Sequence, residues 1–174
     1  MRGDFSAWNK DRSQNFRGTL HQQGRVLLDR DWNAQTEIFG EWQETAARDA
    51  FGAGVAAIPA DSAGSFKVTA ADKSGGSVKI SLNKGRAWAD GLLVELLKDA
   101  TLTAKYLGPP IQNAPAPDDI PANGTKDAVI LETWLEELSA FQAPKLLLED
   151  ALGGVDTTER VQTAFRLRLY RMAA

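Results

Sequence analysis

Residues 22–52 constrain the fold more than any other stretch, because their apolar residues recur at helical spacing. Steps of four and three residues separate successive members of one series: Leu28, Trp32, Gln35, Phe39, Trp42 and Ala46. Residues at this spacing share one stripe of an α-helix. We therefore expect one long helix over residues 22–52, and its aromatic stripe requires a large apolar surface opposite it.

Both ends of this segment carry signals typical of helix ends. Asp29 and Asp31 stand where carboxylates of a first turn favour the free N–H groups and the positive end of the helix dipole. Gly52 is placed to end the helix, since glycine accepts the left-handed conformation there.

The length and amino-acid composition indicate a globular protein without cysteine chemistry. The chain has 174 residues, of which 43% are hydrophobic and 25% charged, which suits one domain with a real core. Its net charge of −3 gives no overall basic footprint for nucleic acid. The absence of cysteine excludes disulfides, thiolate metal sites and cysteine nucleophiles. No apolar run reaches the length of about twenty residues that a membrane span needs.

The part of the chain after residue 52 has the alternation of β-strands. Residues 53–64 form a connector, and strands are expected at 66–70, 78–82, 85–89 and 92–95 as a compact β-meander. Asp90-Gly91 predicts a two-residue hairpin turn. Residues 108–124 hold five of the seven prolines and predict a surface loop.

The last third of the chain gives mixed signals. Residues 127–140 fit both a strand and a helix, and their β-branched and aromatic start favours a strand. Residues 145–152 are expected to form a short helix that ends at Gly153-Gly154. Residues 161–169 alternate as a half-buried strand with a basic outer face. The expected class is α+β, with an N-terminal arm and one long helix (1–52) followed by a mainly antiparallel β body (53–174), together one compact unit.

Residues that could support catalysis are few. His21 is the only histidine and has no nucleophile signature beside it, so we expect a surface or packing role. Asp29-Arg30-Asp31 resembles a divalent-metal pair, but the apolar stripe that follows favours helix N-terminal charge. Gly75-Gly76 and Gly153-Gly154 lack the Gly-Lys-Ser/Thr sequence of a phosphate loop. Three glutamates could supply paired acids for glycoside hydrolysis, although no second acidic cluster stands at a defined spacing: Glu132, Glu136 and Glu137.

A basic stripe near the C-terminus has several interpretations. The stripe consists of Arg160, Arg166, Arg168 and Arg171, together with Tyr170. The stripe suits a solvated sheet face or a contact for an acidic partner better than a nucleic-acid strand. We therefore expect assembly rather than chemistry, with no catalytic residue, cofactor or metal.

Several motifs together resemble one family. In order, these are Gly3-Asp4-Phe5, Gln22-Gln23-Gly24-Arg25-Val26, Leu28-Asp29, Asp31-Trp32-Asn33, Gly85-Arg86-Ala87-Trp88-Ala89-Asp90-Gly91 and Ala151-Leu152-Gly153-Gly154-Val155-Asp156-Thr157. The set is similar to an N-terminal domain family of bacterial proteins found with phage-tail-like contractile injection particles. The hairpin motif at 85–91 also resembles a module of phage baseplate and tail-fibre proteins. The resemblance covers nearly the whole chain.

The resemblance implies a structural, non-catalytic part of such a particle. It would dock onto tail, sheath, tube, baseplate or cap proteins, form homo-oligomers there, and be assembled in the cytoplasm before any release from the cell. The residues expected to dock lie in the arm and the helix: Phe5, Trp8, Phe16, Trp32, Ile38, Phe39 and Trp42. The alternative is a carbohydrate-binding or adhesive module that uses exposed Trp88 or Trp134, and an acid-dependent glycosidase is a third reading.

Overall fold

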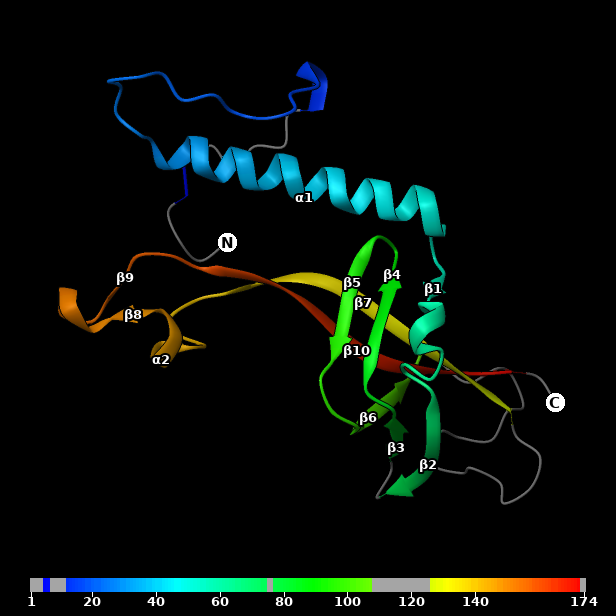
Figure 1. Cartoon of the computed structure of the whole chain (residues 1–174). Helices are drawn as coiled ribbons and strands as arrows, with labels where there is room; N and C mark the ends of the chain where they lie inside the picture. The colour runs from blue at the N-terminus through cyan, green and yellow to red at the C-terminus, as the bar shows by residue number, and fades with distance from the viewer. Residues whose placement is uncertain (1–4, 7–11, 75–76, 108–125, 173–174) are drawn as a thin grey trace. The chain divides into compact units, whose positions relative to one another are not determined.

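The computed structural model describes residues 5–6, 12–74, 77–107 and 126–172 (Figure 1). One long helix near the N-terminus precedes a mostly antiparallel set of strands, so the α+β class expected from the sequence is confirmed. The helices are α1 (Asp29–Phe51) and α2 (Pro144–Leu147). The strands are β1 (Ala56–Ala57), β2 (Val68–Ser74), β3 (Ser77–Leu82), β4 (Gly85–Ala89), β5 (Leu92–Leu96), β6 (Ala100–Tyr106), β7 (Asp127–Leu138), β8 (Leu148–Glu149), β9 (Val155–Asp156) and β10 (Arg160–Arg171).

The chain divides into two compact units, and each is described by itself. The first unit comprises residues 1–52 and 135–162, and therefore holds α1, α2 and the β8–β9 pair. The second comprises residues 53–134 and 163–174, and holds β1 to β6. Strands β7 and β10 run across the division, so each contributes residues to both units.

Helix α1 ends where the sequence predicts but begins later. The expected start at residue 22 is wrong by seven residues, because Leu28 is extended (φ −107°, ψ 140°) and the helix begins at Asp29. Asp29 and Asp31 occupy the first turn, as expected. Gly52 has a φ of 90° and donates its N–H to the Arg48 carbonyl oxygen at 2.8 Å, which confirms its place at the helix end.

The helix expected over residues 145–152 is much shorter. It spans Pro144–Leu147, because Leu148 is extended (φ −79°, ψ 131°) and enters β8. A single 3₁₀ turn then covers residues 150–152. Gly153 and Gly154 both have positive φ, so the expected stop at this pair is confirmed for the turn rather than for a helix.

The main sheet contains a central strand that the sequence analysis missed. Its order is β2-β3-β6-β10-β7, with β6 antiparallel to β3 and parallel to β10. Strand β6 has only Leu102 as a large aliphatic residue, so its alternation is weak. Residues 127–138 form strand β7, which confirms the strand over the helix at this ambiguous segment.

The expected β-meander over residues 66–95 is only partly correct. Strands β2 and β3 pair as a hairpin, but β4 lies between β1 and β5 and pairs with both in a separate three-stranded sheet. Strand β3 instead pairs with β6, and the Lys84 N–H donates to Asp99 Oδ1 at 2.8 Å beside the base of the β4–β5 hairpin. Asp90 (φ 50°) and Gly91 (φ 84°) make the predicted two-residue turn between β4 and β5.

The core of the second unit lies on the main sheet. Its buried residues come from β3, β6 and β10: Val78, Ile80, Leu82, Ala104, Leu167 and Leu169. The alternation expected for residues 161–169 is therefore correct at Leu167 and Leu169, whereas Val161 is exposed. The proline-rich segment 108–124 lies outside the described residues. Among the described helices, none is both long and apolar enough to span a membrane.

Candidate interaction surface

The N-terminal arm lies along α1 in the same unit (Figure 1). Gln35 Oε1 accepts hydrogen bonds from the Thr19 N–H at 2.7 Å and from Thr19 Oγ1 at 3.1 Å. The His21 ring lies 5.8 Å from the Trp32 ring, centroid to centroid. Gln35 is the one polar member of the apolar series from Leu28 to Ala46, and the structure shows that it holds the arm.

The first turn of α1 also contacts the start of the chain. Asn33 Nδ2 donates to the Ser6 carbonyl oxygen at 3.4 Å. A side-chain hydrogen bond with Ser6 lowers the pKa of Asp29. Asp31 lies 3.6 Å from Arg30 Nε. These contacts fit the reading of Asp29 and Asp31 as charges of the helix N-terminus. Among the residues that the structure describes, no three His, Cys, Asp or Glu side chains are grouped so that they could hold a metal ion.

The aromatic side chains of α1 point to solvent. Trp32 is 58% exposed, Phe39 55% and Trp42 64%. We call this face, with Trp32 and Ala46 at its two ends, the α1 stripe. The sequence suggested that this stripe needs an apolar surface opposite it, and within the described residues of the first unit the arm contacts it at Gln35 and Trp32 and leaves the three aromatic side chains more than half exposed.

The less exposed side of α1 carries the charges. Between Trp32 and Ala46 the charged residues are Glu37, Glu41 and Glu44, and all three are half-buried. Every exposed position in that interval is uncharged: Trp32, Thr36, Phe39, Trp42, Gln43, Thr45 and Ala46. The helix thus has its apolar face outward, which is the reverse of an ordinary surface helix.

The residues expected to dock do not all lie on this face. Phe16 is exposed on the arm, and Phe5 and Ile38 are half-buried. Trp8 lies outside the described residues. The sequence identified the three aromatic residues of the stripe, but it gave no sign of the Thr19–Gln35 contact other than a polar residue within an apolar series.

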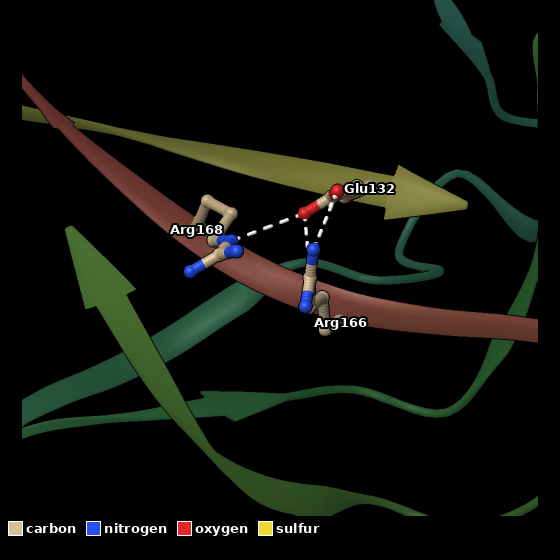
Figure 2. A network of polar contacts seen from close by, with 3 residues as sticks. All are labelled: Glu132, Arg166 and Arg168. Carbon is tan, nitrogen blue, oxygen red and sulfur yellow. Dashed lines mark hydrogen bonds and ion pairs between the residues drawn. The ribbon is translucent and has the colours of Figure 1, made fainter. Parts of the chain in front are cut away.

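A second cluster lies on the neighbouring strands β7 and β10 (Figure 2). Arg166 donates from Nε to Glu132 Oε2 at 2.6 Å and from Nη2 to Glu132 Oε1 at 2.7 Å. Arg168 Nε donates to Glu132 Oε2 at 3.0 Å. The Arg166 hydrogen bonds, followed by that of Arg168, lower the pKa of Glu132 to about 2, and the same carboxylate raises the pKa of Arg166.

This cluster changes how the basic stripe is read. One carboxylate binds two of its four arginines, so the positive charge of Arg166 and Arg168 is partly neutralised. Arg171 ends strand β10. The sequence alternation places Arg166 and Arg168 on one face, but the glutamate that pairs with both comes from another strand, 34 residues before Arg166.

The arrangement of acids does not suit glycoside hydrolysis. Glu136 follows Glu132 by four residues on the same strand, which places their Cα atoms about 13 Å apart. Paired glycosidase carboxylates stand about 5–9.5 Å apart. Glu132 is held by two arginines, and Glu136 accepts a hydrogen bond from Gln162 at 3.4 Å. Glu137 is half-buried.

The two tryptophans proposed for sugar binding are half-buried. The Arg166 guanidinium lies over the Trp134 ring at 5.3 Å from its centroid, so that face of the ring is already occupied. Trp88 lies on β4, opposite Leu93 on β5 and Ala57 on β1. Within the described residues, the tryptophans that are more than half exposed are therefore Trp32 and Trp42 on α1, not these two.

Comparison with protein families matches the whole chain, residues 1–174, to one described as a family of unknown function (DUF6519). The chain belongs to this family. Neither the curated proteins nor the solved structures contain a significant match. Membership covers both units, so the α1 stripe and the main sheet lie within one family domain.

Proposed function

We propose that the protein is a structural, non-catalytic component of a phage-tail-like contractile injection particle. In this role it docks onto neighbouring tail, sheath, tube, baseplate or cap proteins through the arm and α1. It would be assembled in the cytoplasm and leave the cell only as part of the particle. The motif resemblance over nearly the whole chain supports the kind of particle.

The observation that carries the docking role is the outward apolar face of α1. Trp32, Phe39 and Trp42 are each more than half exposed on one continuous stripe. Full burial of a fully exposed aromatic side chain is worth about 2–3 kcal/mol, and these three side chains have only part of their surface left to bury. Contiguous exposed apolar patches larger than a few hundred Å² mark interaction sites. A protein partner on this face would remove that surface from water.

Recovery of particle proteins with the tagged chain tests the proposal. A C-terminally tagged chain would be purified from cells that make the particle, and the co-purifying proteins identified by mass spectrometry. We expect sheath, tube or baseplate proteins. Phe39→Glu should reduce their recovery about tenfold or more, because it places a charge at the centre of the stripe.

Leu97→Glu is the matched control, because it replaces an apolar residue that is 84% exposed and lies outside α1 with the same charged residue. It should leave recovery nearly unchanged. Purification of the tagged chain without any tail protein, or equal recovery with Phe39→Glu, would contradict the proposal.

The absence of catalysis needs a separate test. Purified protein would be incubated with peptidoglycan and with polysaccharides, with and without divalent metal ions. We expect no turnover. Turnover that Glu132→Gln abolishes would overturn the non-catalytic reading.

A further inference from the structure

A second exposed surface lies in the segment between β7 and β10, residues 139–159, which we call the β7–β10 connection. It holds α2 and the β8–β9 pair and belongs to the first unit. Every residue from 144 to 158 is exposed except Leu147. The chain itself therefore leaves most of this stretch open to solvent. Four large apolar side chains of the connection are more than half exposed: Phe141, Leu146, Leu152 and Val155.

Hydrogen bonds fix the backbone of the connection despite this exposure. The Ser139 N–H and Oγ both donate to Gln142 Oε1 at 3.0 Å, and the Ala143 N–H donates to the Ser139 carbonyl oxygen at 3.0 Å. Further on, the Gly154 N–H donates to the Glu149 carbonyl oxygen at 3.0 Å, and strands β8 and β9 pair antiparallel. A segment that is already hydrogen-bonded loses little conformational entropy when a partner binds it.

The charge of the connection is strongly one-sided. It holds one basic and four acidic residues, so it accounts by itself for the net charge of −3 that the whole chain carries. Three of the acids are exposed, namely Glu149, Asp150 and Asp156. In the β8–β9 pair, Asp156 stands opposite Leu148 and Glu149 opposite Val155. Because opposite residues of a pair share one face, a surface that binds here has to offer basic groups beside apolar ones.

The same charges disfavour nucleic acid and membranes as partners. The phosphates of nucleic acid and the headgroups of anionic lipids are negative, and both are bound by basic surfaces. The connection also differs from the α1 stripe, because the exposed positions from Trp32 to Ala46 carry no charge. The two surfaces therefore suit partner surfaces of different chemistry.

We propose that the β7–β10 connection is a second docking site, and that its partner is a protein surface on which basic side chains border an apolar groove. Leu152 and Val155 enter the groove, and Glu149 and Asp156 pair with the basic side chains. The site goes beyond the docking role of α1, because it lies on a different part of the chain and selects a different partner surface.

Binding of a synthetic amphipathic peptide tests the site. A fluorescein-labelled helical peptide with a leucine face bordered by lysines would be titrated with the purified chain and followed by fluorescence anisotropy. We expect saturable binding that weakens as the salt concentration rises. Leu152→Lys should weaken it at least about tenfold, because it removes an apolar contact and adds a repelling charge. Leu97→Lys is the matched control, since it makes the same change at an exposed leucine of the second unit.

Failure of the wild-type chain to bind the peptide, or an equal loss of binding in the two leucine variants, would overturn the proposal. Phe39→Glu should leave peptide binding intact. Binding that Phe39→Glu abolishes and Leu152→Lys leaves intact would assign the peptide to the α1 stripe, and it would also contradict the proposal.

A neutral substitution tests the part played by charge. Asp156→Asn should weaken peptide binding about two- to fivefold and reduce its salt dependence, because one exposed ion pair is lost. Asp72→Asn removes the same charge from β2 in the second unit and should have little effect. Equal affinity and equal salt dependence of the two variants would show that the acids of the connection do not select the partner.

Two further measurements test other occupants. The wild-type chain should not sediment with vesicles of phosphatidylcholine and phosphatidylglycerol. Leu152→Cys carries a single thiol, since the natural chain has no cysteine, and a short bis-maleimide should not join two such chains. Sedimentation with the vesicles would indicate a membrane contact, and cross-linked pairs would indicate a second copy of the chain. Either result would refute the basic protein partner.

Discussion

Glu132 accepts three hydrogen bonds from two arginines on the neighbouring strand β10, and this explains its low pKa. An ionised carboxylate with two guanidinium donors is stabilised in its charged form. The unfolded chain lacks these donors, so its carboxyl returns to the ordinary pKa of 4.5. Because the folded pKa is the lower one, the contribution to stability is complete above about pH 4.5 and is lost as the pH falls towards 2.

Glu132→Gln should therefore lower the melting temperature at pH 7 and have progressively less effect between about pH 4.5 and 2. The loss at pH 7 should be modest, because the pair is solvent-exposed and screened. Thermal melts of both proteins over this pH range measure the difference. Glu136→Gln is the control on the same strand, since its partner is the neutral Gln162. A difference in melting temperature between the wild-type protein and Glu132→Gln that stays constant from pH 7 to 2 would contradict this account.

Gly85 is a second position at which the fold depends on one particular residue. Its φ is +142°, and a Cβ there would overlap the Ser65 side chain and lie 2.8 Å from the Ser65 Cα. Ser65 is itself buried, so it has little room to move. The glycine at the start of the hairpin motif is thus required by the close approach of two backbone segments.

Gly85→Ala should destabilise the fold by about 1–3 kcal/mol or more, through overpacking together with an unfavourable φ. Chemical denaturation monitored by circular dichroism measures the loss. Gly64→Ala is the matched control, because its Cβ would meet only Asn83 Nδ2 at 3.9 Å. Equal stability of the two variants would show that Ser65 yields to the added methyl group.

At the scale of elements, the sequence predicted what depends on local pattern. Helix α1, its end at Gly52 and the Asp90-Gly91 turn follow from periodicity and glycine chemistry, and the structure has all three. Strand β6 was missed because its pairing with β3 and with β10 is non-local and its side chains are mostly small or polar. The separation of the β4–β5 hairpin from the main sheet depends on the same pairing.

The direction in which α1 presents its stripe could not be predicted from periodicity. An apolar stripe of a helix usually faces the core, but here the half-buried side carries Glu37, Glu41 and Glu44. Hydrophobic spacing predicts which residues share one face of a helix, but it does not predict what packs against that face. The contact between the arm and Gln35 could not be predicted from the sequence either, because one amide side chain joins residues 16 positions apart.

Gln35→Ala should loosen the arm from α1. Loss of the acceptor for the Thr19 N–H removes about 1 kcal/mol, which corresponds to about a fivefold increase in the open population. Hydrogen exchange at the Thr19 amide should accelerate by a similar factor. Gln43→Ala changes the same residue type on the exposed face and should leave that amide unchanged. An unchanged rate in Gln35→Ala would mean that other contacts hold the arm.

At the scale of the whole molecule, one chain combines a folded β body with a long helix whose aromatic side chains are more than half exposed at Trp32, Phe39 and Trp42. The body has a buried core on the main sheet. The first unit instead exposes large apolar side chains on both the arm and the helix, among them Phe16, Leu20 and Trp42. Such surface favours association in water, which is why we propose a role in assembly.

Oxidative footprinting of purified particles tests the central claim, that protein covers the α1 stripe in the working state. The labelling rates of Trp32 and Trp42 in the particle would be divided by their rates in the unfolded chain, so that intrinsic reactivity cancels. Trp32 and Trp42 are 58% and 64% exposed in the single chain, and we predict that both are labelled at least about tenfold more slowly in the particle than in the unfolded chain. Labelling of both rings in the particle as fast as in the dilute isolated chain would contradict the account.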